Sequence, residues 1–235
     1  MNNDESERSA QSSTGRSGRG APSSNDAGTV ASPSEPLVTA FGRLIFYHGP
    51  MGAGKSTFAL QTHFNQGQQG RRGVLITTLD RSGEPRVTSR IGLAADAVVF
   101  GDGVDLHAVL TARARDGLDY VVCDEAQFLT TDDVEALARL VDDAAIDVFA
   151  FGLLTDFRSV LFPGSARLVE LADEVHRMQA IVLCWCGRPA FLNARVIDGV
   201  VVRSGELVAV GDTDDAPMMY RALCRRHHRD GRAAG

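Results

Sequence analysis

A glycine-rich loop at residues 49–56 constrains the fold of this chain more than any other stretch. It follows the apolar run at residues 44–47 and matches the phosphate-binding pattern of two glycines that bracket four residues, followed by Lys and Ser. Glycines let the backbone turn tightly enough for several N–H groups to face phosphate oxygens, and the helix after the loop adds its positive end. The sequence therefore predicts a domain that binds a nucleoside triphosphate. The predicted contacts are Gly49, Pro50, Met51, Gly52, Ala53, Gly54, Lys55, Ser56 and Thr57.

The lysine of this loop is the only lysine of the chain. Of 24 Lys and Arg residues, Lys55 alone is Lys. An ammonium on a flexible stem is a compact point charge, whereas the guanidinium of Arg is a planar fork. We expect Lys55 to reach the β- and γ-phosphates and the hydroxyl of Ser56 to bind Mg²⁺. The alternative is an ordinary glycine-rich turn with a solvated lysine, which the strand-loop-helix setting disfavours.

Length and charge exclude several classes of protein. A chain of 235 residues can form one large domain, or one domain with a small appendage. Its net charge of −6 argues against a broad surface for nucleic acid or membrane, although a local basic site stays open. Apolar stretches stay short of the ~20 residues of a membrane helix, and the first residues are neither basic nor apolar. We expect a cytoplasmic protein.

The order of apolar and amphipathic stretches predicts the fold class. Residues 1–40 are rich in Ser, Gly, Asn, Asp and Pro, so we expect a disordered extension. Strands then alternate with helices, which predicts an α/β domain at 41–182 with a mostly parallel sheet flanked by helices. A small lobe at 183–229, with strand-like segments at 194–202 and 207–210, and a tail at 230–235 are expected to complete the chain. Strands are expected at 44–48, 74–79, 97–100, 118–123 and 147–152, and helices at 55–69, 105–115, 132–143 and 166–173.

Two carboxylates follow the apolar strand at 118–123. Asp124 at the tip of this strand is expected to be the outer partner of Mg²⁺. We place the strand beside the one that carries the phosphate loop, so that Glu125 can act as a base near the γ-phosphate. Glu125 could activate a water in an ATP-driven motor or an alcohol in a kinase, and a plain surface carboxylate is the third option. Cys123 is expected to belong to the core.

Three of the four cysteines lie in the last quarter of the chain, which suggests a metal site instead of disulfides. Cys184 and Cys186 form one pair, and Cys224 with His227 forms a second pair. Three thiolates and one imidazole suit a closed tetrahedral Zn²⁺ site that stabilises a lobe too small for its own core. The first pair is C-x-C instead of C-x-x-C, and His228 is an alternative fourth ligand. Buried free thiols are the other interpretation.

Taken together, five motifs resemble those of a known family. They are Gly49-Pro50-Met51-x-x-Gly54-Lys55-Ser56, Asp124-Glu125-Ala126-Gln127-Phe128, Thr155-Asp156-Phe157-Arg158, Cys186-Gly187-x-Pro189-Ala190 and Tyr220-x-x-x-Cys224-x-x-His227. The sequence resembles thymidine kinases of the cellular and bacterial, zinc-containing type from about Arg43 to His228. The Cys-Trp-Cys form is similar to an actinobacterial variant.

The resemblance implies transfer of the ATP γ-phosphoryl group to the 5′-hydroxyl of thymidine, with Glu125 as the base, Mg²⁺ as cofactor and a structural Zn²⁺. It implies catalytic roles for Lys55 and for Arg195, which would lie near the sugar or phosphates. It also implies a lasso that closes over the nucleoside, and a homotetramer. The implied substrate contacts are Met51, Phe128, Phe157, Tyr220 and, in the lasso, Val208, Val210 and Gly211.

Two other functions stay open at this point. A nucleic-acid-dependent ATPase with a zinc ribbon would use the same phosphate loop, but the chain has little room for a second motor domain and little basic surface. A nucleotide-sensing module would bind ATP without stimulated turnover.

Overall fold

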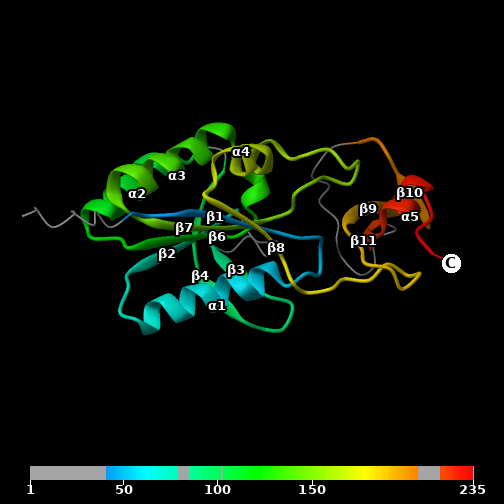
Figure 1. Ribbon diagram of the computed structural model, residues 1–235, viewed down its shortest axis with the longest axis horizontal. Coiled ribbons are helices and arrows are strands. Elements are labelled where there is room, and N and C mark those ends of the chain that lie inside the picture. The colour runs from blue at the N-terminus through cyan, green and yellow to red at the C-terminus, as the bar shows by residue number, and fades with distance from the viewer. Residues whose placement is uncertain (1–40, 79–84, 102, 206–217, 235) are drawn as a thin grey trace, which may run out of the picture. The chain divides into compact units, whose positions relative to one another are not determined.

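The computed structural model describes residues 41–78, 85–101, 103–205 and 218–234, and its α/β part is built on a parallel sheet of six strands (Figure 1). The strand order is β5-β2-β6-β7-β1-β8, and every pairing in this sheet is parallel. The predicted α/β fold class is thereby confirmed. The strands are β1 (Leu44–His48), β2 (Gly73–Thr77), β5 (Val98–Val99), β6 (Tyr120–Cys123), β7 (Asp147–Gly152) and β8 (Glu174–Arg177).

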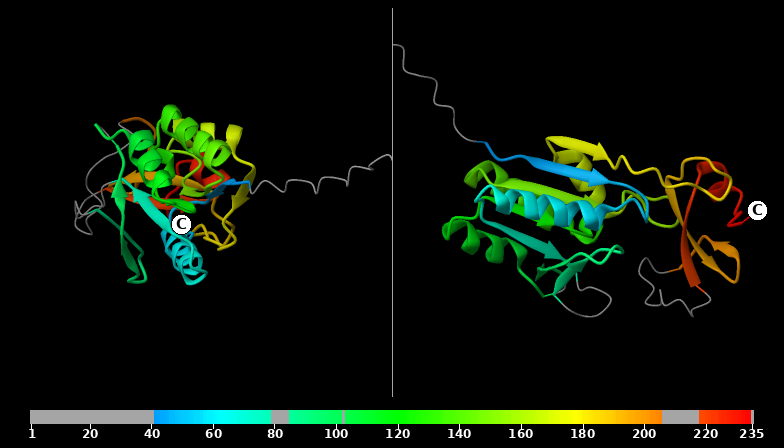
Figure 2. Two further views of the ribbon diagram at one scale, coloured as in Figure 1. Left: turned by 90° about the vertical axis from the view of Figure 1, so that its left-hand side faces the viewer. Right: turned by 90° about the horizontal axis from the view of Figure 1, so that it is seen from below.

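Helices cover both faces of the sheet because the central strands are apolar on both sides. On one face lies α1 (Lys55–Gln68), together with the antiparallel hairpin of β3 (Arg86–Thr88) and β4 (Ala94–Asp96) (Figures 1 and 2). On the other face lie α2 (Leu106–Arg115), α3 (Thr131–Ala144) and α4 (Pro163–Leu171). The sheet thus separates two buried clusters, and all four residues of β6 are buried between them.

The helix starts follow from local chemistry. Thr130 and Asp133 form a capping box that begins α3, and Asp105 accepts a hydrogen bond from the N–H of Ala108 to begin α2. Helix α4 begins at Pro163, three residues before the predicted start, because a proline fits the first helical position, where no N–H is needed. None of the described helices is both long and apolar enough to cross a membrane.

One expectation about the sheet is wrong. We placed the strand that ends in Cys123 beside the strand of the phosphate loop, but β7 lies between β6 and β1. Since neighbouring strands are about 4.8 Å apart, the tips of β1 and β6 are separated by roughly 10 Å. The inserted strand therefore places Glu125, which follows β6, two strands away from the phosphate loop.

The lobe that follows is a separate sheet of three antiparallel strands. Its central strand β9 (Leu192–Ile197) pairs with β10 (Val200–Val202) and with β11 (Met218–Leu223), and α5 (Arg225–Arg229) closes it. The segment at 194–202, predicted as one strand-like stretch, is a hairpin, because Asp198 and Gly199 both have positive φ and form a two-residue turn. The expected extension at 1–40, the strand at 207–210 and the contacts Val208, Val210 and Gly211 lie outside the described residues.

Residues after the predicted lobe boundary also contact this sheet. Arg232 makes a β-bridge with Val200, and the carbonyl oxygen of Ala233 accepts a hydrogen bond from Arg221 Nη1 at 3.2 Å. Ala233 is buried in the lobe's apolar cluster. The segment predicted as a tail thus packs on the lobe as far as Ala233.

Candidate active site

The phosphate loop joins the carboxyl end of β1 to the first turn of α1. Gly54 precedes α1 with φ of 78°, and Gly52 has φ of 80°, a region that residues with a Cβ rarely adopt. Gly54 has no side chain to cap the first turn of the helix, so the N–H groups there stay available to an anion. A Cβ at Gly49 would come within 3.1 Å of Met178 and Ala53. The glycines of the motif therefore serve backbone conformation and close packing.

Lys55 is buried within this loop. Its Nζ donates hydrogen bonds to the carbonyl oxygens of Gly49 and Pro50, each at 3.2 Å. Burial lowers the pKa of Lys55, whereas the carboxylates of Glu125 and Asp124 oppose that shift. The ammonium is therefore held on the inner side of the loop and within electrostatic reach of both predicted carboxylates.

Asp124 follows β6 and has the surroundings of a cation ligand. It is 3% exposed, and within the described part of the chain its Oδ1 has no hydrogen-bond partner. Burial raises the pKa of Asp124 to about 7 and the charge of Glu125 adds to that rise, whereas a hydrogen bond with Ser56 and the charge of Lys55 lower it. A buried, unpaired carboxylate oxygen beside a hydroxyl fits the oxygen ligands that Mg²⁺ prefers.

Glu125 is held in an uncommon conformation at the start of the short 3₁₀ helix η1 (Ala126–Phe128). Its φ of 54° lies in the left-handed region, which costs on the order of 1 kcal/mol for a residue other than glycine. The side chain of Gln127 donates a hydrogen bond to Glu125 Oε2. Gln127 in turn accepts one from the N–H of Leu153 at 2.9 Å. Gln127 therefore ties Glu125 to the end of β7, a positioning role that the sequence motif alone did not reveal.

A cluster of Phe157, Arg195 and Tyr220 joins the lobe to the α/β part. Both Nε and Nη2 of Arg195 donate to the hydroxyl of Tyr220, at 3.0 and 2.8 Å, and the guanidinium lies 4.0 Å from the centroid of the Phe157 ring. Arg195 is 4% exposed. The loop that presents Phe157 is fixed by Asp156, whose Oδ1 accepts hydrogen bonds from the N–H groups of Arg158 and Val160. Arg195 thus contacts two other residues predicted for the site, Phe157 and Tyr220.

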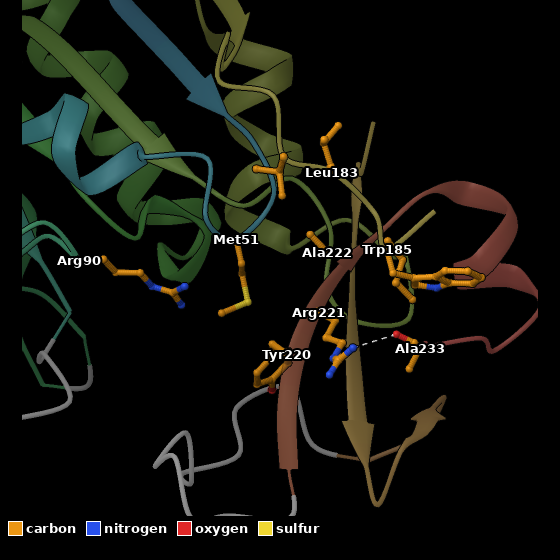
Figure 3. Close-up of a pocket in the computed structure, with 10 residues that line it drawn as sticks. Met51, Arg90, Leu183, Trp185, Tyr220, Arg221, Ala222 and Ala233 are labelled. Carbon is orange, nitrogen blue, oxygen red and sulfur yellow. Dashed lines mark hydrogen bonds between the residues drawn. The ribbon is translucent and has the colours of Figure 1, made fainter. Parts of the chain in front are cut away.

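Met51 and Tyr220 line one pocket of about 280 Å³ (Figure 3). Met51 comes from the phosphate loop and Tyr220 from β11, so this pocket lies between the loop and the lobe. Arg90, from the turn between β3 and β4, also lines it and points toward Met51 in Figure 3. The charge of Arg90 contributes to the lowered pKa of Lys55. Sequence reasoning missed Arg90, because it lies in the turn of a short hairpin that carries no recognisable motif.

Phe128 does not line the pocket that Met51 and Tyr220 share. Its ring packs edge-on against Phe162 at 5.8 Å, and it is 38% exposed. It follows Glu125 by three residues but does not line the pocket of Met51 and Tyr220. The structure thus joins Met51 with Tyr220, and Tyr220 with Phe157 through Arg195, whereas a substrate contact for Phe128 stays a prediction.

The four predicted zinc ligands come together in the lobe. The ligand atoms of Cys184, Cys186, Cys224 and His227 all lie within 4.8 Å of one another. Two thiolates bound to one tetrahedral Zn²⁺ stand about 3.8 Å apart. The observed separations are 4.0 Å between Cys186 Sγ and Cys224 Sγ, and 3.4 Å between Cys184 Sγ and His227 Nδ1. The cluster therefore has the size and the donors of a closed zinc site, in spite of the short C-x-C spacing.

The surroundings of the cluster support thiolate and imidazole ligands. Burial would raise the pKa of Cys184, but hydrogen bonds from the backbone of Cys186 and Cys224 bring it down to about 6. The indole of Trp185 stacks on the His227 ring at 4.1 Å, and its Nε1 donates to the carbonyl oxygen of Arg232. Trp185, the residue between the two cysteines, thus fixes the orientation of the imidazole.

The neighbouring His228 has another role. It is 2% exposed, and its Nε2 lies 2.9 Å from the carbonyl oxygen of Phe157. Nη1 of Arg203 lies 3.2 Å from its Nδ1. His228, the alternative ligand, therefore lies outside the cluster and joins α5 to the Phe157 loop.

Comparison with known proteins agrees with this geometry. A family model described as thymidine kinase matches residues 42–228, which is most of the chain and includes both the phosphate loop and the zinc cluster. This chain belongs to the thymidine kinase family. The matched range ends at His228, just past the fourth zinc-cluster residue, so the family includes the lobe.

Several bacterial thymidine kinases are similar to this chain. A thymidine kinase of Cutibacterium acnes is 52% identical over 191 residues, which cover 80% of this chain and 88% of that protein. One of Streptomyces coelicolor is 52% identical over 190 residues, covering 79% and 88% respectively. One of Novosphingobium aromaticivorans is 46% identical and is covered to 95% of its length. The similarity to the two actinobacterial enzymes accords with the variant suggested by the Cys-Trp-Cys motif.

Proposed function

We propose that this chain transfers the γ-phosphoryl group of ATP to the 5′-hydroxyl of thymidine. Its family and the kinase activity that goes with it follow from the match to residues 42–228. The observation that carries the choice of reaction is the position of Glu125. This carboxylate stands at the tip of β6, two strands from the phosphate loop, and its side chain accepts a hydrogen bond from Gln127.

The proposed chemistry assigns one task to each group. Glu125 accepts the proton of the 5′-hydroxyl while the hydroxyl oxygen attacks the γ-phosphorus. The bond between the γ-phosphorus and the oxygen that bridges to the β-phosphate breaks, and ADP leaves with that oxygen. Lys55 and the N–H groups of the loop stabilise the negative charge of the phosphoryl group in the transition state. Arg195 holds Tyr220, and through it the wall of the nucleoside pocket.

Two metal ions complete the proposal. Ser56 and Asp124 would hold Mg²⁺, which would offset the negative charge of the phosphate groups. Cys184, Cys186, Cys224 and His227 would hold Zn²⁺. Because four protein donors fill a tetrahedral site, this zinc has a structural role and takes no part in phosphoryl transfer.

Thymidine is recognised, in this proposal, by the pocket between loop and lobe. Met51, Tyr220, Phe157 and Phe128 would pack around base and sugar, and Val208, Val210 and Gly211 would contact the base through the lasso. A homotetrameric assembly and a cytoplasmic location are further predictions taken from the family resemblance and the composition.

A nucleoside panel tests the proposal. The full chain is incubated with Mg²⁺, ATP and, in separate reactions, thymidine, deoxyuridine, deoxycytidine, deoxyadenosine or single-stranded DNA, and ADP release and nucleoside monophosphate are measured. We expect thymidine to stimulate ADP release with equimolar thymidine monophosphate, and Lys55→Ala to lose that activity. Stimulation by single-stranded DNA instead would indicate a nucleic-acid-dependent ATPase. ATP binding without stimulation by any acceptor would indicate a sensing module, and either result would reject the proposal.

A further inference from the structure

Two polar side chains on one face of β9 are buried. Asn193 and Arg195 are two residues apart and each is 4% exposed. Ala194 and Val196 alternate with them and belong to the lobe's apolar cluster. Asn193 and Arg195 therefore point away from the lobe's own core. Arg195 contacts the Phe157 ring, and Asn193 reaches the phosphate loop.

The contact of Asn193 is a hydrogen bond to the backbone of the loop. The N–H of Met51 donates to Asn193 Oδ1 at 2.8 Å, across 142 residues of sequence. A backbone N–H can only donate, so the oxygen of the amide must face Met51 and the orientation of the side chain is determined. Asn193 is thus a direct link between the lobe and the phosphate loop, and not part of the lobe's interior.

The carbonyl group of Pro50, next to the Met51 N–H, accepts a hydrogen bond from Lys55. The carbonyl oxygen of Pro50 accepts hydrogen bonds from the N–H of Ala53 and from Lys55 Nζ, both at 3.2 Å. Pro50 and Met51 share a peptide unit, so the carbonyl that contacts Lys55 and the N–H that contacts Asn193 belong to the same rigid plane. A rotation of that plane changes both contacts together.

The side chain of Met51 extends this link to the nucleoside side. It lines the pocket of about 280 Å³ opposite β11, where Tyr220 and Ala222 form the other wall (Figure 3). Ala222 is the register partner of Asn193, and Tyr220 is the partner of Arg195. Strand β9, which contacts the phosphate loop through Asn193, is therefore paired with β11, which lines the pocket.

From these contacts we infer that Asn193 is a positioning residue that couples occupancy of the nucleoside pocket to the conformation of the phosphate loop. A nucleoside that contacts Tyr220 and Ala222 restricts the motion of β11 and of its partner strand β9. The hydrogen bond of Asn193 then restricts the rotation of the peptide plane between Pro50 and Met51. ATP binds more tightly to a loop already held in place, because less conformational freedom is lost on binding. By linkage, ATP raises the affinity for the nucleoside by the same factor. This inference rests on the proposed function only for the identity of the nucleoside.

Replacing Asn193 by Ala removes the tether without removing a phosphate contact. A second cavity of about 180 Å³ is lined by His48, Gly49, Pro50 and Asn193 among others, so a water can take part of the vacated space. We therefore expect a loss of about 2- to 13-fold in affinity, the range for a hydrogen bond that water partly replaces. The matched control is Asn65→Ala, because Asn65 accepts a hydrogen bond from Gln61 on the exposed surface of α1.

The experiment measures binding of AMP-PNP with Mg²⁺ by calorimetry, alone and with saturating thymidine, for the wild type, Asn193→Ala, Asn193→Asp and Asn65→Ala. In Asn193→Ala we expect weaker binding of AMP-PNP alone. We also expect the thymidine-induced gain, which is the ratio of AMP-PNP affinity with thymidine to that without it, to fall toward one. Asn193→Asp retains an acceptor for the Met51 N–H, so we expect it to keep the thymidine-induced gain even if its added charge weakens AMP-PNP binding. Zinc content and melting temperature are measured for each variant to show that the lobe stays folded.

Two results would overturn the inference. One is an equal thymidine-induced gain in Asn193→Ala and the wild type, and the other is a wild type in which thymidine leaves AMP-PNP affinity unchanged. Failure of the proposed function looks different, because the wild type then phosphorylates no thymidine in the nucleoside panel. The affinity of AMP-PNP alone still tests the tether in that case: unchanged affinity in Asn193→Ala contradicts it.

Discussion

The α/β core and the lobe differ in what holds them together. The core buries large side chains on both faces of a six-stranded sheet, among them Phe46, Tyr120, Phe151 and Leu137. Among the described residues, the lobe's buried cluster has eight members, of which three are alanines and two are cysteines, and the largest of these eight is Leu223. Because stabilisation by burial scales with apolar area, the lobe depends on its Cys and His cluster for a stable fold.

The same division separates the residues that we propose for phosphoryl transfer from residues that we propose for the nucleoside site. Lys55, Asp124 and Glu125 are carried by the core at the carboxyl ends of parallel strands, whereas Arg195 and Tyr220 are carried by the lobe. A defect in the core should therefore reduce turnover and leave the lobe folded. A defect in the lobe should remove the nucleoside site and leave ATP binding largely in place.

The largest expected effect is on turnover and arises in the core. Glu125→Gln keeps the size of the side chain but removes the base, so we expect kcat for thymidine to fall by about 10²- to 10⁴-fold. Affinity for AMP-PNP should stay within about twofold, since no phosphate contact is removed. Glu135→Gln on α3, where the Glu135 side chain pairs with Arg139 and Arg167, is the control and should keep full turnover. Near-normal turnover of Glu125→Gln would remove this residue from the role of base.

The next largest expected effect is the loss of the zinc site in the lobe. Cys224→Ser removes a buried ligand, and we expect less than one equivalent of zinc by metal analysis and a loss of about 100-fold or more in kcat/KM for thymidine. AMP-PNP affinity should fall no further than in Asn193→Ala, because the core keeps its own stability.

Cys123→Ala is the control for the zinc ligand. Cys123 is fully buried in the core at the end of β6, so its loss should lower the melting temperature but leave the zinc content unchanged. Full zinc and full thymidine affinity in Cys224→Ser would contradict the structural role of the metal.

A smaller effect concerns the contact between the two parts. Tyr220→Phe removes the hydroxyl that accepts from Arg195 and leaves a buried guanidinium with fewer partners. We expect KM for thymidine to rise by about 10-fold, the usual size for a hydrogen bond to a charged group, with kcat reduced less. Tyr120→Phe removes a hydroxyl that contacts His63 away from the site, and its KM should equal that of the wild type. Equal KM values for both variants would show that the Tyr220 hydroxyl does not contribute to nucleoside binding.

The smallest effect is confined to the core and depends on pH. Burial lowers the pKa of His63 below its ordinary value. The unfolded chain therefore binds a proton at this residue where the folded protein does not, so the folded state loses stability as the pH falls below about 6.5. In His63→Gln the difference in melting temperature between pH 7.5 and pH 5.5 should shrink by about 2 °C or less. An unchanged difference would show that His63 does not contribute.

The sequence predicted the central strands of the core well. Strands β1 and β7 have the predicted bounds, because each is a short apolar run bounded by polar or glycine residues. Strand β8 (Glu-Val-His-Arg) was missed, since an edge strand with polar, exposed residues carries no apolar signal. The order of strands was also beyond reach, because the insertion of β7 between β1 and β6 depends on crossovers and not on the composition of any strand.

The candidate site likewise has residues that the sequence could name and contacts that it could not. The loop and metal motifs are short patterns of residue types, so their residues could be named from the sequence. Lys55 lies within electrostatic reach of Asp124, and the four Cys and His residues form a cluster in the lobe. The contacts of Asn193 with Met51 and of His228 with Phe157 span 142 and 71 residues. No periodic pattern connects residues so far apart, and only the fold brings them into contact.

Trp185 gives the lobe a spectroscopic property of its own. It is the only tryptophan of the chain, it stacks on His227, and it lines the pocket between the loop and β11 (Figure 3). Its near-ultraviolet absorption and fluorescence can be excited selectively at wavelengths where tyrosine absorbs little. The intrinsic emission of the whole protein at such wavelengths therefore reports on one ring, beside the metal cluster and the nucleoside pocket, without any attached dye.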